Sequence, residues 1–151
     1  MHQLLAQFTD ALQVTATIEQ LFSAHGITAA PSWSWMPQEL PGWPVASVTF
    51  DHQAKHGDRT LSWSVNWMAD DADTGGHLYI NLALFPAKHR DPVVDCYYHI
   101  PTRCWDFTFE DRPSTCRSEL MGAGFAEGGL PNERLPELCA ILARAFLSAH
   151  E

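Results

Sequence analysis

Short segments that alternate apolar and polar side chains fill the middle of the chain, and brief connections separate them. Five such segments are found: residues 45–51, 61–68, 77–85, 93–100 and 103–110. Strict alternation over a few residues is typical of a strand with one buried face. Because short connections can join only antiparallel neighbours, the sequence predicts a five-stranded antiparallel meander.

Helical spacing marks the first part of the chain, between residues 3 and 25. Its apolar residues are predicted to form the side that faces the core: Leu5, Phe8, Leu12, Ile18, Leu21 and Phe22. Gly26 follows and is a natural residue to end a helix, because glycine adopts a positive φ without strain. We expect this helix to cover one face of the sheet.

Two further helical segments follow the strands. Ser114 is predicted to cap a short helix that ends near Gly122 and Gly124, and Asn132 to cap the last helix, with Pro136 in its first turn. The core-facing side of that last helix contains Leu135, Leu138, Cys139, Ile141, Leu142, Ala145 and Phe146. The prediction is one α+β domain over residues 1–151, in two layers, with the N-terminal and C-terminal helices on one face of the sheet.

Charge and composition exclude several classes of function. The chain has 9 basic and 18 acidic residues, a formal charge of −9, and no cluster of basic residues that could bind nucleic acid or an anionic membrane. No apolar run approaches the roughly 18 residues of a membrane span, and the first residues lack the basic start of a secretory signal. An acidic chain instead suits a basic protein partner, but we favour the alternative, in which the charge only keeps the protein soluble.

The four cysteines are Cys96, Cys104, Cys116 and Cys139. No C-x-x-C pair occurs among them, and a chain of this length can form a core without disulfide bonds. Cys96 and Cys139 fall inside a strand pattern and a helix pattern, where they act as small core residues. We therefore expect reduced thiols and a cytoplasmic protein.

Residues 31–44 contain four prolines and three tryptophans. Proline interrupts helices and sheet ladders, so this segment is predicted to be an extended or turning linker. Trp33, Trp35 and Trp43 fit either of two roles. They can be core side chains, which we favour for large rings in a small domain, or part of a binding surface, where tryptophan is enriched.

The last two strand segments allow a prediction of register. If Pro101 and Thr102 form the centre of the hairpin, His99 lies opposite Cys104, and Tyr97 lies opposite Asp106. One face then contains Val94, Cys96, Tyr98, Ile100, Trp105, Phe107 and Phe109, and the other contains Asp95, Tyr97, His99, Cys104, Asp106, Thr108 and Glu110. A slip of one residue would exchange the two sets, so burial of the apolar set should fix the register.

The polar side of the predicted sheet is the main candidate for a functional surface. Ser62, Ser64, Asn66, Tyr79 and Asn81 join the polar set named above, and lysine is absent from all these positions. Tyrosines among short hydrogen-bonding side chains are typical of recognition surfaces. The predicted partner-binding residues are Tyr79, Tyr97, His99 and Asp106, together with Trp33 and Trp35. The alternative is a face that is covered only by water.

One cluster of residues could support catalysis. His99 with Asp95, Asp106 and Cys104 contains a base, two carboxylates that could orient it, and a nucleophile. Nothing in the spacing supplies an oxyanion hole, and such groups also occur together on ordinary polar strands. We therefore favour the hypothesis that the protein is not an enzyme. If it is an enzyme, these four residues are its predicted catalytic site.

Two segments have spacings similar to metal sites. His52 and His56 are four residues apart, but in a predicted turn, and Asp70–Asp73 begins like a calcium loop that lacks the acidic residue at its twelfth position. We expect neither segment to bind a metal tightly. Motifs for phosphate, dinucleotide or zinc-protease sites are absent, so no cofactor is predicted.

The favoured hypothesis is a small, acidic, cytoplasmic protein-binding domain. In general character it resembles the bacterial inhibitor proteins that neutralise a cognate toxin by direct binding, although no motif in the sequence identifies a protein family. A secretion chaperone or adaptor is a close variant. The alternatives are a small enzyme or ligand-binding domain centred on His99, and a structural or oligomeric role through the tryptophan-rich segment.

Overall fold

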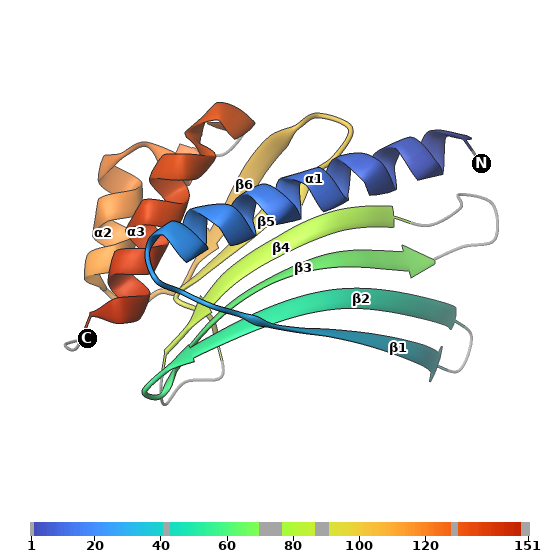
Figure 1. The fold of residues 1–151 in the computed structure, drawn as a ribbon, viewed down its shortest axis with the longest axis horizontal. Helices are drawn as coiled ribbons and strands as arrows, with labels where there is room; N and C mark the ends of the chain where they lie inside the picture. The colour runs from blue at the N-terminus through green and yellow to red at the C-terminus, as the bar shows by residue number, and fades with distance from the viewer. Residues whose placement is uncertain (1, 41–42, 70–76, 87–90, 128–129, 149–151) are drawn as a thin grey trace.

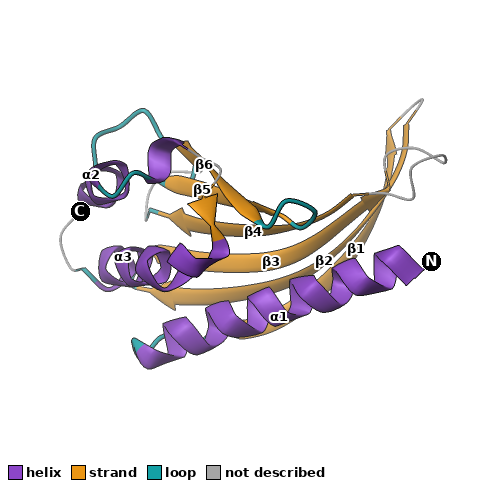
Figure 2. Cartoon of the chain, turned by 90° about the horizontal axis from the view of Figure 1, so that it is seen from above, coloured by secondary structure: helices purple, strands orange, loops and turns teal. Residues whose placement is uncertain are grey.

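The computed structural model describes residues 2–40, 43–69, 77–86, 91–127 and 130–148. The helices and strands are α1 (His2–Ala24), β1 (Ala30–Leu40), β2 (Trp43–His56), β3 (Arg59–Ala69), β4 (His77–Phe85), β5 (Val94–His99), β6 (Cys104–Phe109), α2 (Thr115–Gly122), β7 (Leu130–Pro131) and α3 (Leu135–Leu147). Short 3-10 turns lie at Phe125–Glu127 and Asn132–Arg134. The strands pair in chain order, each antiparallel to the next, and the helices pack on one side of the sheet (Figures 1 and 2).

The predicted α+β architecture is confirmed, with more strands than the five predicted. Those five correspond to β2–β6, and β1 and the two-residue β7 are added at the edges. The prediction of a linker over residues 31–44 is wrong, because β1 pairs with β2 from Ala30 opposite Gln53 to Leu40 opposite Trp43. Prolines are tolerated here because β1 is an edge strand, which needs backbone partners on only one side.

The β5–β6 hairpin has the predicted register. Tyr97 lies opposite Asp106, and His99 lies opposite Cys104. The connection differs from the predicted two-residue turn: pairing stops at His99 and Cys104, and the backbone amide of Arg103 donates to the carbonyl of His99 at 2.8 Å. Arg103 adopts a φ of 55°. The longer turn keeps the same centre, so the two faces of the hairpin are unchanged.

Helix α1 ends as predicted at Gly26, whose φ is 76°. The amide of Gly26 donates to the carbonyl of Ser23, and the amide of Ile27 donates to that of Phe22, which is the Schellman arrangement. The predicted core side of α1 is confirmed in part, because Ile18 and Phe22 are fully buried and Phe8 and Leu21 pack against the core. Its other buried residues are Ala11, Val14 and Thr15. Leu5 and Leu12, predicted to face the core, are 60% and 55% exposed. Small residues at positions 11 and 15 let the helix approach the sheet, which turns the two leucines outward.

The C-terminal helices are confirmed in part. Ser114 caps α2, because its hydroxyl accepts a hydrogen bond from the amide of Arg117 at 3.0 Å. Asn132 does not cap α3, which follows Arg134 instead. The side chain of Asn132 accepts a hydrogen bond from the indole nitrogen of Trp105 at 3.2 Å. A buried indole needs a hydrogen-bond acceptor. The side-chain oxygen of Asn132, which the sequence pattern predicts to cap a helix, is instead the acceptor for Trp105.

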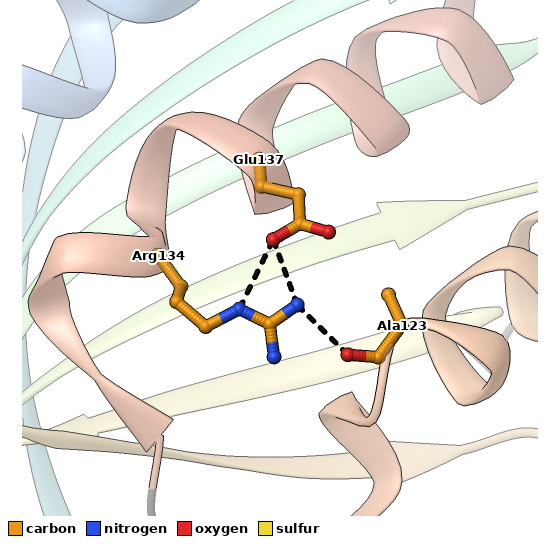
Figure 3. A network of polar contacts seen from close by, with 3 residues as sticks. All are labelled: Ala123, Arg134 and Glu137. Carbon is orange, nitrogen blue, oxygen red and sulfur yellow. Dashed lines mark hydrogen bonds and ion pairs between the residues drawn. The ribbon is translucent and has the colours of Figure 1, made fainter.

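Arg134 connects the two C-terminal helices (Figure 3). Its guanidinium donates to the carboxylate of Glu137 at 2.7 and 3.0 Å and to the carbonyl of Ala123, just after α2, at 2.8 Å. The same group lies 4.3 Å from the centre of the Phe125 ring. One side chain thus joins the start of α3 to the segment that follows α2.

The core lies between the helices and strands β3–β6, with Ala54 of β2 at its margin. Trp63, Trp105 and Phe22 are among its largest fully buried side chains, and Leu138 and Leu142 of α3 belong to the same cluster. The prediction that Trp105 is buried beneath the helices is therefore confirmed. Phe107 and Phe109 are partly buried against this core, and Phe107 contacts Phe125 edge-on at 5.3 Å.

Candidate functional site

The candidate site is the sheet face that faces away from the helices, here called the polar face. Directly opposed residues of neighbouring strands share a face, and three adjacent rows of such residues cross the sheet. They are Asp51–Ser64–Asn81–Tyr97–Asp106, Thr49–Asn66–Tyr79–His99–Cys104 and Gln53–Ser62–Ala83–Asp95–Thr108. These rows contain three aspartates and no Lys or Arg. The polar residues predicted from alternation therefore lie on one continuous surface.

Asp95 is the centre of a hydrogen-bond network on this face. One carboxylate oxygen accepts from the Tyr97 hydroxyl at 2.9 Å, and the other accepts from the side-chain amide of Asn81. The ring of Tyr79 lies 6.0 Å from that of Tyr97. Burial, the hydrogen bond to Asp95 and the charge of that carboxylate raise the pKa of Tyr97 to about 12. The phenol is therefore a neutral donor at physiological pH, held in one orientation.

His99 and Asp106 form an exposed pair beside this network. The Nε2 atom of His99 lies 2.8 Å from a carboxylate oxygen of Asp106, and about half of each side chain is accessible. Cys104 lies opposite His99 in the register, but its thiol donates a hydrogen bond to the carbonyl of Thr102 at 3.3 Å. The structure thus brings Asp95, His99, Cys104 and Asp106 onto one face without joining cysteine and histidine into a catalytic pair.

Strand β2 adds polar residues to this face that the alternation pattern of the other strands does not include. The hydroxyl of Thr49 donates to the side-chain carbonyl of Asn66 at 2.9 Å, and the amide of Asn66 donates to the hydroxyl of Ser64 at 2.8 Å. Asp51 accepts from Gln53 at 2.6 Å. Part of the signal is present in the sequence, because Thr49 and Asp51 alternate with Val48 and Phe50. The polar face therefore extends one strand further than predicted.

Trp33, one of the two tryptophans predicted to bind a partner, does not belong to the polar face. Trp33 pairs with Phe50, which is in the same row as Val65, Ile80, Tyr98 and Trp105. That row faces the helix layer. Trp33 is nevertheless 71% exposed, so its predicted core role is wrong. Trp35 pairs with Val48, and its side chain lies outside the described residues.

The two candidate metal segments differ in what the structure describes. His52 and His56 lie in β2 rather than in a turn, so they are separated by about 13 Å of extended strand. The ring of His52 stacks on Trp63, and that of His56 lies against Phe146. Asp70–Asp73 lies outside the described residues. Among the residues that are described, no three His, Cys, Asp or Glu side chains come together as a metal would need.

A cavity of about 860 Å³ lies at the end of the sheet near the β2–β3 turn, away from His99. Its lining includes Arg59, Arg112, Glu110, Phe85 and Ser114. Arg112 pairs with Glu110 at 3.4 Å, and a nitrogen of Arg59 donates to the carbonyl of Phe146 at 3.4 Å. The cationic groups of this cavity thus have partners within the protein.

No protein-family model matches the chain, and neither does any curated protein or solved structure. Within the described ranges, no helix is both long and apolar enough to cross a membrane. The interpretation of function therefore depends on the geometry above.

Proposed function

We propose that the protein is a non-enzymatic binding domain that uses the polar face to contact a basic protein partner, in the manner of an inhibitor that neutralises a toxin. The observation that carries this proposal is the continuous polar face. It combines Tyr79 and Tyr97 with oriented amides and carboxylates, on a sheet whose other face supplies the core. Tyrosine offers a large contact area at a small cost in conformational entropy.

Charge supports a basic partner. Asp51, Asp95 and Asp106 lie in the rows of this face, and the whole chain has a charge of −9. Complementary charge speeds association and selects against acidic partners. All four cysteines are free thiols, which fits a role in the reducing cytoplasm.

Binding is favoured over catalysis by the surroundings of His99. Its pair with Asp106 is open to solvent, the thiol of Cys104 is engaged elsewhere, and the large cavity is at the other end of the sheet. A catalytic base works best where a substrate can be enclosed and water excluded. An exposed charged pair instead suits the edge of a contact surface.

The test is a binding measurement on a partner captured from the native host. Tyr97→Ala should weaken the complex by about 1–2 kcal/mol, and Asp106→Asn should mainly slow association. Glu127→Gln is the matched control, because it removes one exposed charge next to Phe125, which packs on the helix-bearing side of the sheet, and should bind like the wild type. If both polar-face variants bind like the wild type, the partner surface is elsewhere. Turnover that His99→Gln abolishes would favour the enzyme alternative.

A further inference from the structure

Three neighbouring side chains of the polar face, Asp95, Tyr79 and Tyr97, are here called the tyrosine–aspartate site. All three are partly buried. One carboxylate oxygen of Asp95 accepts a hydrogen bond from the Tyr97 hydroxyl at 2.9 Å, and the other accepts one from the side-chain amide of Asn81. An ionised carboxylate has roughly four acceptor positions, so about two remain for a further donor. The protein thus fixes the orientation of this carboxylate without using all of its hydrogen-bonding capacity.

The charge of Asp95 has no cationic partner among the residues that the structure describes. Its two hydrogen-bond donors are a neutral phenol and a neutral amide, and the ion pairs within the described ranges involve other carboxylates. Of the other two aspartates in the rows of the polar face, Asp106 pairs with His99, and Asp51 accepts from Gln53. A hydrogen bond from a cationic donor to a carboxylate is short and strong. A cation supplied by a partner would therefore complete the surroundings of Asp95.

The two tyrosine rings select among cations. The ring centres of Tyr79 and Tyr97 are 6.0 Å apart, and the ring planes are inclined by 47°. A guanidinium is planar and weakly hydrated, so it can stack on an aromatic ring while its edge donates to a carboxylate. A lysine ammonium is a compact, strongly hydrated charge that gains less from such stacking. Two rings beside one oriented carboxylate therefore favour arginine over lysine.

We propose that the tyrosine–aspartate site binds one arginine side chain of the protein partner. This inference rests on the proposed function and specifies which side chain the polar face recognises. The guanidinium donates to the remaining acceptor positions of Asp95 and stacks on the ring of Tyr79 or Tyr97. The three rows of the polar face contain no Lys or Arg, so no cation within those rows competes for the site. The polar face then distinguishes basic partners by the geometry of one residue as well as by charge.

The first test uses short peptides with a lysine at each end that differ only at the central position. That position is arginine, lysine or citrulline, which has the shape of arginine without its charge. Nuclear magnetic resonance titration of the full chain measures the affinity of each peptide. The arginine peptide should bind at least about fivefold more tightly than either of the others. It should also shift the side-chain amide signal of Asn81, because that amide donates to the same carboxylate.

The second test places the arginine on the site. Asp95→Asn and Tyr79→Leu should each remove most of the preference for arginine, because one removes the charge and the other removes a ring. Asp106→Asn removes a charge from the same face outside the site, so it should weaken the arginine and lysine peptides by the same factor. Glu127→Gln, on the helix-bearing side, should bind all peptides like the wild type. Melting curves check the fold of each variant, and Tyr79→Leu decides if Asp95→Asn unfolds.

The outcomes separate this inference from the proposed function. Equal affinity of the arginine and lysine peptides, with signals of the polar face shifted by both, would overturn the arginine site and leave a basic partner as the proposal. An arginine preference that persists in both Asp95→Asn and Tyr79→Leu would place the arginine elsewhere and also overturn the inference. Binding of neither peptide, or shifts confined to the helix-bearing side, would contradict the proposed function together with the site.

Discussion

Trp33 and Trp105 belong to one cross-strand row on one face of one sheet, yet their environments are opposite. The first is 71% exposed on β1, and the second is 1% exposed on β6. The difference comes from the helix layer, which covers β3–β6 and the end of β2 around Ala54 and leaves Trp33 of β1 and Phe50 of β2 open (Figure 1). An apolar strand pattern therefore identifies a face of the sheet, whereas burial also requires an element that covers it.

The largest expected effect tests this contrast in stability. Trp105→Ala should lower the free energy of unfolding by about 3–5 kcal/mol, because it removes a buried ring and leaves the side chain of Asn132 without its donor. Trp33→Ala should change it by less than about 0.5 kcal/mol, as is usual for exposed sites. Urea unfolding followed by circular dichroism measures both. Similar losses in the two variants would mean that Trp33 is covered in solution.

Thiol reactivity compares the two faces of the same hairpin. Cys104 lies on the polar face and is partly exposed, whereas Cys96 faces the core and is fully buried. Burial also raises the pKa of Cys96 and raises that of Cys139 to about 12, which suppresses both thiolates. We expect one thiol per chain to react rapidly with an aromatic disulfide reagent, and Cys104→Ser to remove that phase. A fast phase that persists in this variant would contradict the assignment.

Arg134→Lys tests how firmly the helix layer is held. Lysine keeps the charge but cannot contact Glu137, the Ala123 carbonyl and the Phe125 ring together, as the guanidinium does. The expected loss in stability is about 1 kcal/mol. Thermal unfolding measures it, with Arg144→Lys as the control, because Arg144 pairs only at the surface with Glu119.

The smallest expected effect concerns pH. The pKa of Tyr97 is about 12 in the folded protein against 10.0 for a free phenol, so the folded state holds this proton more tightly. The stability that the neutral phenol contributes is therefore complete below pH 10 and is lost as the pH rises toward 12. Between pH 9 and pH 11, the midpoint of urea unfolding should decrease less in Tyr97→Phe than in the wild type. Equal falls would show that the network around Asp95 does not hold the proton.

The parts of the fold that the sequence predicts well are those determined by local pattern. The β5–β6 register follows from alternation and a short connection, and the end of α1 follows from Gly26. The polar face was likewise predicted, because alternation assigns its residues to one side of each strand. Its hydrogen-bond partners depend on contacts between strands and needed the structure.

The misassigned segments depend on distant parts of the chain. Prolines in residues 31–44 resemble a linker until β1 is known to be an edge strand. Asn132 resembles a helix cap in the sequence, but its side-chain oxygen accepts a hydrogen bond from Trp105, which is distant in sequence. Leu12 resembles a core residue because periodicity does not say which flank of a helix the sheet covers.

The prolines of β1 have a consequence for how the protein behaves when concentrated. An outer strand with a free row of amides can act as a template on which further chains add as strands, and apolar side chains beside it favour such growth. Pro31 and Pro37 lack the amide hydrogen that each added ladder would need, and they lie on either side of the segment that contains Trp33. The first strand can thus keep an apolar side chain open to solvent while resisting fibril formation.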